Sequence, residues 1–307
     1  MKSTPTIIGA TPPAVKVKPP VIIRDEPLLP PSVMLLGDVG AGKTYAIISA
    51  LKAGLKVFVI VTENAGVDSL IEAVKVHRLP IENLHWARCT PARQSWAVLK
   101  DQAKISNSSG VSEIQTMTTG LDRFKYPAFM KLIDICANFR CDRTKEEYGD
   151  VLSWSDDTLL ALDSLSGLGD IASTHVCGHR ITMTQPEFGV VQNHIMILLN
   201  QLTATNCYFM VSAHTELETD EVKGTTKLMA STVGKKLAPK LPRIFSDVIY
   251  AKISNDKYVW STKEANVATK SRYLKPGMYP ADFKLLIDGY RERKAEAEKE
   301  MQPETIA

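Results

Sequence analysis

Near its start the chain contains the stretch Val33-Met34-Leu35-Leu36-Gly37-Asp38-Val39-Gly40-Ala41-Gly42-Lys43-Thr44, with the pattern G-x-x-x-x-G-K-T. The four apolar residues that open it are typical of a buried strand. Residues 45–51, Tyr-Ala-Ile-Ile-Ser-Ala-Leu, are typical of an amphipathic helix. A glycine-rich turn between a strand and a helix directs backbone N–H groups and the helix N-terminus toward one point, where they bind phosphate oxygens. The stretch therefore predicts a phosphate-binding loop.

Within this loop the pattern assigns separate roles to two side chains. The Lys43 ammonium is expected to reach the β- and γ-phosphates of a nucleotide, and the Thr44 hydroxyl is expected to bind Mg²⁺. The predicted cofactors are therefore ATP and Mg²⁺. The residues expected to contact the nucleotide are Gly37, Asp38, Val39, Gly40, Ala41, Gly42, Lys43, Thr44 and Tyr45.

Length and composition limit the classes of protein to consider. The 307 residues suit one large α/β domain or two smaller ones, and 44% hydrophobic residues can build a sizeable core. The formal net charge is only +3, so any nucleic-acid surface must be a local patch. The chain has no apolar run of about 18 residues and no secretory signal, so we expect neither a membrane span nor export.

Five cysteines are spread widely along the sequence, and their number is odd. This pattern favours free thiols in a reducing cytoplasm. A zinc site built from Cys136, Cys141, Cys177 and His179 is the alternative, although the sequence lacks a C-x-x-C pair.

Proline density and charge divide the chain into three parts. Residues 1–30 form a Pro-rich arm, because seven prolines exclude a helix or a central strand there. The arm either remains solvated or packs on a neighbouring subunit. Residues 31–288 are predicted to form the ATPase domain, and residues 289–307 a charged C-terminal tail.

Hydrophobic patterns within the domain predict a three-layer α/β fold with a mainly parallel sheet. Long polar loops are expected at 106–120, 167–186 and 215–239. The strands are expected at 33–36, 56–63, 84–87, 158–166, 207–214, 246–253 and 258–262, and the helices at 45–51, 67–78, 96–106, 126–139, 190–202 and 291–300.

Three of the predicted strands end in polar residues that suit phosphoryl transfer. Ligands bind beyond the carboxyl ends of the strands in such sheets. The Asp163 carboxylate is expected to orient water around Mg²⁺ beside Thr44. Ser164 is a further candidate for the coordination shell of the metal. Glu63 is the candidate that orients the attacking water, and His214 the candidate that senses the γ-phosphate.

The order of these motifs is similar to the RecA-like ATPase core. The resemblance covers about residues 30–275 and is closest to phage-encoded RecA-like ATPases, the group that includes single-strand annealing partners. The stretches that carry it, besides the strand ends, are Arg140-Cys141-Asp142-Arg143-Thr144, Leu162-Asp163-Ser164-Leu165-Ser166-Gly167-Leu168 and Leu237-Ala238-Pro239-Lys240-Leu241-Pro242. His214 stands where RecA has a glutamine, and RecA's flanking domains are missing.

This resemblance implies an oligomeric ATPase whose loops at 167–186 and 215–239 face single-stranded DNA. A lysine cluster suits phosphate contacts, which provide most sequence-independent affinity. The DNA-binding candidates are Lys223, Lys227, Lys235, Lys236, Lys240 and Arg180. Such cores commonly bind ATP between subunits, and Lys270 and Arg272 are the candidates for a cation donated to the neighbour's γ-phosphate.

The sequence thus predicts a Mg²⁺-dependent ATPase, phage-encoded, that binds single-stranded DNA in recombination, repair or replication. We expect a homo-oligomer, with a phage single-strand-binding or annealing protein as a possible partner. Two alternatives stay open. One is a regulatory or loader ATPase that acts on a protein without touching DNA, and the other is a DNA motor or packaging ATPase.

Overall fold

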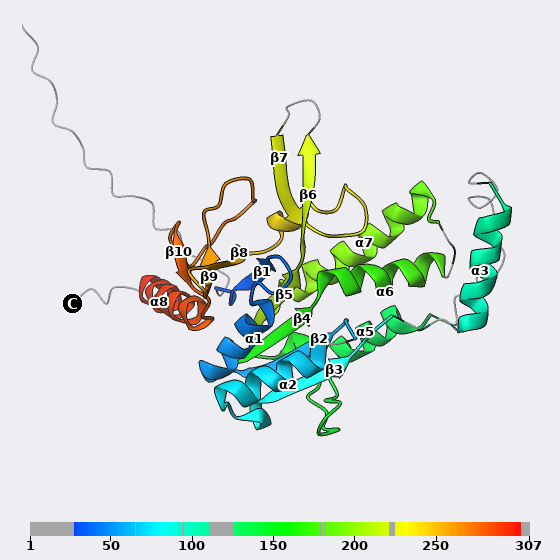
Figure 1. Cartoon of the computed structure of the whole chain (residues 1–307). Coiled ribbons are helices and arrows are strands. Elements are labelled where there is room, and N and C mark those ends of the chain that lie inside the picture. Colours follow the sequence, from blue (N-terminus) through cyan, green and yellow to red (C-terminus); the bar gives the residue numbers. More distant parts are fainter. Residues whose placement is uncertain are drawn as a thin grey trace, which may run out of the picture.

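The computed structural model of the chain describes residues 28–64, 66–91, 93, 95–110, 126–178, 180, 182–220 and 225–301. Most of the Pro-rich arm, most of the loop predicted at 106–120, Lys223 and His179 lie outside these residues. The described part forms three layers, with helices on both faces of a central sheet (Figure 1). The predicted three-layer α/β fold with a mainly parallel sheet is confirmed.

Within the described residues the central sheet has eight strands in the order β10-β9-β8-β1-β5-β4-β2-β3. The six strands from β8 to β3 are parallel to their neighbours, and β9 and β10 add an antiparallel edge. The bounds are β1 Ser32–Leu36, β2 Lys56–Val61, β3 Leu84–Arg88, β4 Thr158–Asp163, β5 Tyr208–Ala213, β8 Asp247–Ser254, β9 Lys257–Ser261 and β10 Met278–Pro280.

Helices cover the two faces because the parallel strands are apolar on both sides. Alternate residues of one strand point to opposite faces, so Val33 and Leu35 pack against α1, α2 and α8, whereas Met34 and Leu36 pack against α5, α6 and α7. The helix bounds are α1 Lys43–Lys52, α2 Gly66–His77, α3 Trp96–Ser108, α5 Ala128–Ala137, α6 Leu165–Cys177, α7 Gln185–Leu202 and α8 Lys284–Met301, with short turns η1 Ile81–Asn83, η3 Val151–Ser153 and η4 Leu241–Arg243.

The predicted loop at 167–186 is wrong over most of its length, because α6 occupies Leu165–Cys177. Its glycines suggested a loop, but Gly167 lies where the helix crosses the end of β2. A Cβ atom there would be 2.4 Å from Thr62 Oγ1, so only glycine allows this close packing. Helix α7 also begins five residues before the predicted start, at a capping box formed by Thr184 and Glu187.

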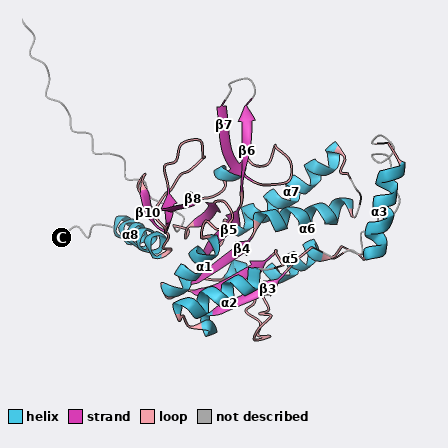
Figure 2. Cartoon of the chain, viewed as in Figure 1, coloured by secondary structure: helices cyan, strands magenta, loops and turns pink. Residues whose placement is uncertain are grey.

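The predicted loop at 215–239 is wrong in its first half. Strands β6 Thr215–Asp220 and β7 Thr225–Ala230 pair antiparallel and form a hairpin separate from the central sheet. The hairpin stands away from the body of the molecule, above β5 in the view of Figure 1 and drawn as magenta strands in Figure 2. It continues directly from the strand that ends at Ala213.

Helix α8 begins seven residues before the predicted tail helix. Its first half is part of the core, because Leu286, Ile287 and Tyr290 are buried against the sheet. The boundary predicted between residues 288 and 289 therefore lies inside one continuous helix. Only the second half of α8 has the exposed, charged character that the sequence suggested.

Candidate nucleotide-binding site

The turn between β1 and α1 presents an open helix N-terminus. Gly42 occupies the position before the helix in the left-handed conformation, with φ of 85°. The N-terminus of α1 has no side-chain cap and no acidic residue in its first turn. Its first N–H groups and the positive end of the helix dipole are therefore available to an anion such as phosphate.

The Lys43 side chain is buried beneath this turn. Its Nζ donates hydrogen bonds to Gly37 O at 2.7 Å and Asp38 O at 2.8 Å, and lies 3.3 Å from His214 Nδ1. Burial lowers the pKa of Lys43 below its ordinary value, while Asp163 and other nearby carboxylates oppose this effect. The structure thus holds the cation inside the turn, within reach of a bound phosphate group.

The side chain of Asp163 lies at the carboxyl end of β4, where it accepts a hydrogen bond from Ser212 Oγ on β5. Burial raises the pKa of Asp163, and the charge of Glu63 adds to this effect. The Thr44 hydroxyl lines the same cavity. A carboxylate and a hydroxyl that line one cavity are hard oxygen donors, and the charge of the carboxylate needs a cation when it is withdrawn from water, so these residues fit Mg²⁺.

Glu63 is positioned by hydrogen bonds between the ends of β2 and β4. Thr62 Oγ1 accepts a bond from Ser164 N at 2.7 Å and donates one to Ser164 O at 2.9 Å. Ser164 Oγ donates to Glu63 Oε1. Because these bonds fix the two strand ends together, the Glu63 carboxylate is held beside Asp163 with a defined orientation.

His214 follows β5 and connects the turn with the hairpin. Its Nε2 lies 3.7 Å from Glu63 Oε1, and its backbone oxygen accepts a bond from Ser231 N at 2.8 Å. The next residue, Thr215, donates from its hydroxyl to Asp38 Oδ1 in the phosphate-binding turn. A shift of the turn would therefore be transmitted to the base of the β6–β7 hairpin.

These groups line one cavity of about 510 Å³. Pockets of about 300–1,000 Å³ are typical of small-molecule sites. The cavity brings together five residues that the sequence singled out: Lys43, Thr44, Glu63, Asp163 and His214. Gly37, Asp38 and Ala41 of the predicted nucleotide contacts do not line it.

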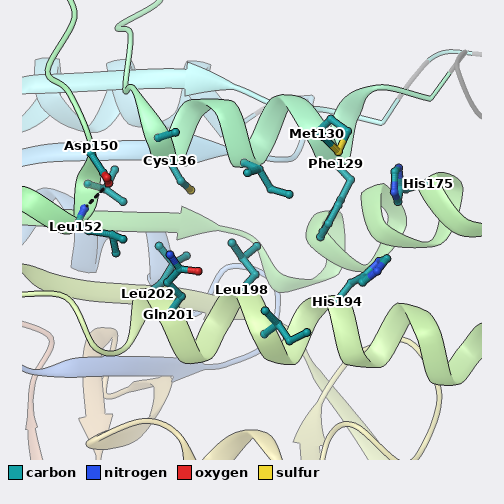
Figure 3. A pocket seen from close by; sticks show the side chains of 14 residues that line it. Phe129, Met130, Cys136, Asp150, Leu152, His175, His194, Leu198, Gln201 and Leu202 are labelled. Carbon is teal, nitrogen blue, oxygen red and sulfur yellow. Dashed lines mark hydrogen bonds between the residues drawn. The ribbon is translucent and has the colours of Figure 1, made fainter.

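A second cavity, of about 380 Å³, lies between α5, α6 and α7 on the opposite face of the sheet (Figure 3). Its walls are mainly apolar, with Phe129, Met130 and Leu198 among them. The histidines His175 and His194 stand at one end and Asp150 at the other. This cavity lacks the lysine, open helix N-terminus and paired carboxylates of the first, so the polar cavity is the better nucleotide site.

Comparison with known families agrees with this geometry. A family model described as an AAA domain matches residues 29–273. The chain belongs to this family. An AAA domain is a P-loop ATPase fold, and the matched region contains every residue that lines the polar cavity.

Curated proteins and solved structures add nothing about the function of the chain. No match was found among curated proteins. Among solved structures, a protein from a structural study of Pyrococcus horikoshii OT3 is similar at 7% identity, over 80% of this chain and 94% of that chain, with a TM-score of 0.33.

The DNA-binding candidates are distributed over three places in this AAA domain. Lys235, Lys236 and Lys240 are exposed on the turn that follows β7. Lys227 is exposed on β7, directly opposite Glu218 on β6. Arg180 is largely buried in an ion pair with Glu187, so its guanidinium is already occupied.

The two candidates for a donated cation lie far from the AAA domain's own phosphate-binding turn. Lys270 pairs through its backbone with Val248, and Arg272 N donates to Asp247 Oδ1 at 3.0 Å. Both contacts are at the start of β8, at the amino end of the parallel strands, whereas the turn lies beyond their carboxyl ends. Both side chains are exposed.

Other features of the site were absent from the sequence prediction. The cavity is also lined by Ser69, Glu72 and His77 of α2 and by Tyr258 of β9. A Cβ atom at Gly42 would lie 2.6 Å from the Tyr258 ring, so the ring packs directly on the phosphate-binding turn. No local pattern in the sequence connects these positions.

The described residues were predicted to hold free thiols and no membrane span. No group of three or more His, Cys, Asp or Glu side chains in that part of the chain forms a metal-binding cluster. All five cysteines are buried free thiols, and burial raises the pKa of Cys89 to about 11. No helix that the structure describes is both long and apolar enough to cross a bilayer.

Proposed function

We propose that the chain is a Mg²⁺-dependent ATPase, phage-encoded and homo-oligomeric, that binds single-stranded DNA during recombination, repair or replication in a bacterial cytoplasm. The main support for ATP hydrolysis is that one cavity is lined by Lys43, Thr44, Glu63, Asp163 and His214. The DNA-binding part rests on the exposed lysines of the turn at 235–240 and on its link to that cavity.

Each of these side chains has a different role in the proposed hydrolysis of ATP. Lys43 and the N-terminus of α1 bind the phosphates, and Glu63 orients the attacking water at the γ-phosphate. Thr44 and Asp163 would hold Mg²⁺, which when bound neutralises charge on the phosphate oxygens. Phosphoryl transfer depends mainly on positioning and charge stabilisation. The hydrogen bond that Ser164 donates to Glu63 contributes to this by fixing the orientation of the carboxylate.

The segment at 231–240, which includes the turn at 235–240, supports a DNA site that is coupled to the nucleotide cavity. Ser231 N bonds to His214 O, and Val233 O accepts a bond from Gln192 Nε2 on α7 at 3.0 Å. The turn is therefore fixed between the nucleotide cavity and the α7 helix. Lys235 and Lys236 project from it without a hydrogen-bonded or ionic partner among the described residues, which suits contacts with phosphates.

One observation favours the alternative in which the hairpin contacts a protein. In its described residues, β6 carries Glu216 and Glu218, and the Leu217 side chain between them is 68% exposed. Acidic side chains repel DNA, whereas an exposed leucine suits a protein surface. We therefore assign DNA contact to the turn at 235–240 and leave β6 to a protein partner, such as a phage single-strand-binding or annealing protein.

The test measures binding of labelled single-stranded DNA by fluorescence anisotropy at several salt concentrations. Lysines bound to phosphates release counterions, with a slope of about −0.7 per contact on single strands. Replacing Lys235 and Lys236 by serine should make the slope of log affinity against log salt less negative by about 1.4. The matched control replaces Lys100 and Lys104, two exposed lysines of α3, in the same way.

The ATPase rate with and without single-stranded DNA completes the test. We expect DNA to stimulate hydrolysis in the parent and in the α3 control, and to stimulate the Lys235/Lys236 variant less. A parent that hydrolyses ATP but neither binds nor responds to DNA would favour the loader that acts on a protein. A parent whose rate equals that of Lys43→Ala would refute the ATPase assignment itself.

A further inference from the structure

The apolar cavity between α5, α6 and α7 is a groove that no step of the proposed hydrolysis uses (Figure 3). Its mouth is formed by large apolar side chains that solvent reaches. Met130 and Ile133 of α5 are exposed there, and so is Ile197 of α7, at 56%. Exposed apolar side chains that gather around one hollow, rather than lying scattered, mark an interaction surface. The described part of the chain leaves this surface uncovered.

Helix α3 projects apolar side chains and buries none of them. It stands at the edge of the molecule, and its residues are all exposed or half-buried (Figure 1). The Trp96 side chain is 87% exposed, and Leu99, one turn further along the same side of the helix, is exposed as well. A helix of 13 residues is only marginally stable without a packed face. Helix α3 therefore needs a surface on which to pack.

The groove and α3 complement each other in chemistry and size. Of the fifteen large apolar side chains that the described residues expose, three lie on α3 and four line the groove. The indole of Trp96 is a large apolar ring, and a cavity of about 380 Å³ has room for it. Because Trp96 is exposed while the groove is uncovered, α3 does not fill the groove of its own chain. A second copy supplies both features.

The charges beside the two features have opposite signs. Arg93 precedes Trp96 by three residues and is exposed. Asp150 lines one end of the groove, where its Oδ1 accepts a bond from Leu152 N at 2.8 Å (Figure 3). The Asp150 side chain is also exposed, so its carboxylate is accessible to a cation from another chain. Opposite charges at matching positions favour one orientation of docking.

The two features lie toward opposite ends of the sheet. Helix α3 follows β3, so it lies beyond the carboxyl ends of the parallel strands (Figure 1). The groove extends to η3 and to the end of α7 at Leu202, which directly precede β4 and β5 and so lie near the amino ends of these strands. A contact between the two features therefore joins copies head to tail. The same direction carries Lys270 and Arg272, at the amino end of β8, toward a neighbour's phosphate-binding turn.

We propose that Trp96 of one copy of this chain inserts into the groove between α5 and α7 of the next copy, with Arg93 paired to Asp150 across the boundary. This inference rests on the homo-oligomeric part of the proposed function and names the contact that joins the copies. A tryptophan buried in a pocket, with an arginine beside it, is the composition typical of an interface hot spot. Each copy uses its helix on one side and its groove on the other, so copies add in one direction.

Sedimentation velocity of the full chain over a range of concentrations, with Mg²⁺ and ADP, measures the assembly. Trp96→Ala removes the indole, and Ile197→Glu places a charge in the mouth of the groove. Met130→Glu changes the opposite wall and repeats the test with an independent substitution. Val98→Ala, on the other side of α3, and Val190→Glu, at an exposed position of α7 outside the groove, are the matched controls. Thermal unfolding checks that these exposed substitutions keep the fold.

Trp96→Ala and Ile197→Glu should each raise the dissociation constant of the assembly by about thirtyfold or more, the effect typical of truncating a hot spot. Both controls should assemble as the parent does. A mixture of Trp96→Ala with Ile197→Glu should form pairs with the affinity of the parent contact, because the intact indole of the second enters the intact groove of the first. The pairs should not grow further, because the helix and the groove that remain are both defective.

Two results would overturn the contact while the homo-oligomer survives. One is assembly of Trp96→Ala and Ile197→Glu at the parent's affinity, and the other is a mixture of the two folded variants that forms no pairs. A parent that sediments as a monomer at every concentration would refute the contact together with the homo-oligomeric part of the proposed function. ATP hydrolysis is judged separately, by comparing the parent with Lys43→Ala, so none of these results decides the ATPase assignment.

Discussion

The Nε2 atom of His214 lies 3.7 Å from Glu63 Oε1, while its Nδ1 atom lies 3.3 Å from Lys43 Nζ. A lysine ammonium only donates hydrogen bonds, so Nδ1 is the acceptor and the proton of the neutral ring is on Nε2. The ring therefore presents its N–H toward the carboxylate. One histidine thus connects Glu63, the carboxylate proposed to orient water, with Lys43, the cation of the phosphate-binding turn.

Replacement of Glu63 by glutamine should keep nucleotide binding but slow hydrolysis by about 100-fold or more, the usual contribution of a general base or water-positioning group. The amide has nearly the same shape but cannot accept a proton or polarise water as strongly. Single-turnover hydrolysis and equilibrium ATP binding measure the two effects separately. Glu82→Gln, in the exposed turn η1, is the matched control. Hydrolysis at the parent rate would assign the role to another carboxylate.

Replacement of His214 by alanine should reduce DNA-stimulated hydrolysis more than basal hydrolysis. The reason is its position between Glu63 and the segment at 231–240, to which its backbone is hydrogen-bonded through Ser231. Steady-state ATPase rates with and without single-stranded DNA measure the ratio, and the basal rate of the same variant is the internal control. If both rates fall by the same factor, the histidine has a catalytic or structural role without coupling.

The phosphate-binding turn and the strand ends could be predicted because each depends on a short local pattern. The G-x-x-x-x-G-K-T pattern needs only its neighbouring strand and helix. The polar residues Glu63 and Asp163 follow apolar runs, and the carboxyl ends of parallel strands meet at one edge. Their hydrogen bonds to Ser164 and Ser212 could not be predicted, since these depend on the order of β2, β4 and β5 in the sheet.

Two segments predicted as loops, and the contact made by Tyr258, differ in what the sequence could have shown. The glycines of α6 suggested a loop, although Leu165, Leu168 and Ile171 have helical spacing. Gly167 is needed because Thr62 packs closely against it, and this contact cannot be recognised from the local sequence. The β6–β7 hairpin had a usable signal, threonine-rich runs separated by a segment that contains a glycine. Tyr258 had none, because its contact with Gly42 joins distant parts of the sequence.

Acid should weaken the fold through His85 on the edge strand β3. Its ring stacks on Phe58, and its Nδ1 lies 3.1 Å from Tyr148 Oη. Burial, followed by the charge of Arg143, lowers the pKa of His85 from 6.5 to about 4. The unfolded chain therefore binds a proton that the folded chain does not bind between about pH 6.5 and about pH 4, and stability falls as the pH falls through this range.

Urea unfolding at about pH 7 and about pH 4.5 measures this effect. His85→Phe should lose less stability on acidification than the parent, by about 2 kcal/mol, because one pKa unit corresponds to about 1.36 kcal/mol. The control His77→Gln changes an exposed histidine of α2 and should behave as the parent does. Identical pH dependence in the parent and His85→Phe would show that other groups control acid unfolding.

Arg272 is predicted to act across a subunit boundary. Its exposed side chain lies at the amino end of β8, opposite the end of the sheet that carries its own phosphate-binding turn, so it has no path to its own γ-phosphate. In a head-to-tail assembly that same end of the sheet would face a neighbour's cavity. A cation donated in this way stabilises transition-state charge and can raise the rate by a factor of about 10³ to 10⁵.

Arg272→Ala should therefore lower the ATPase rate without lowering nucleotide affinity in the isolated subunit. Lys275→Ala, a nearby exposed lysine, is the matched control. Mixing Arg272→Ala with Lys43→Ala subunits should restore some activity, because an interface between the two can pair an intact phosphate-binding turn with an intact arginine. Light scattering establishes that the two variants assemble together. If they do assemble together and no activity returns, Arg272 does not act in trans, and Lys270→Ala in the same mixture decides whether its neighbour does.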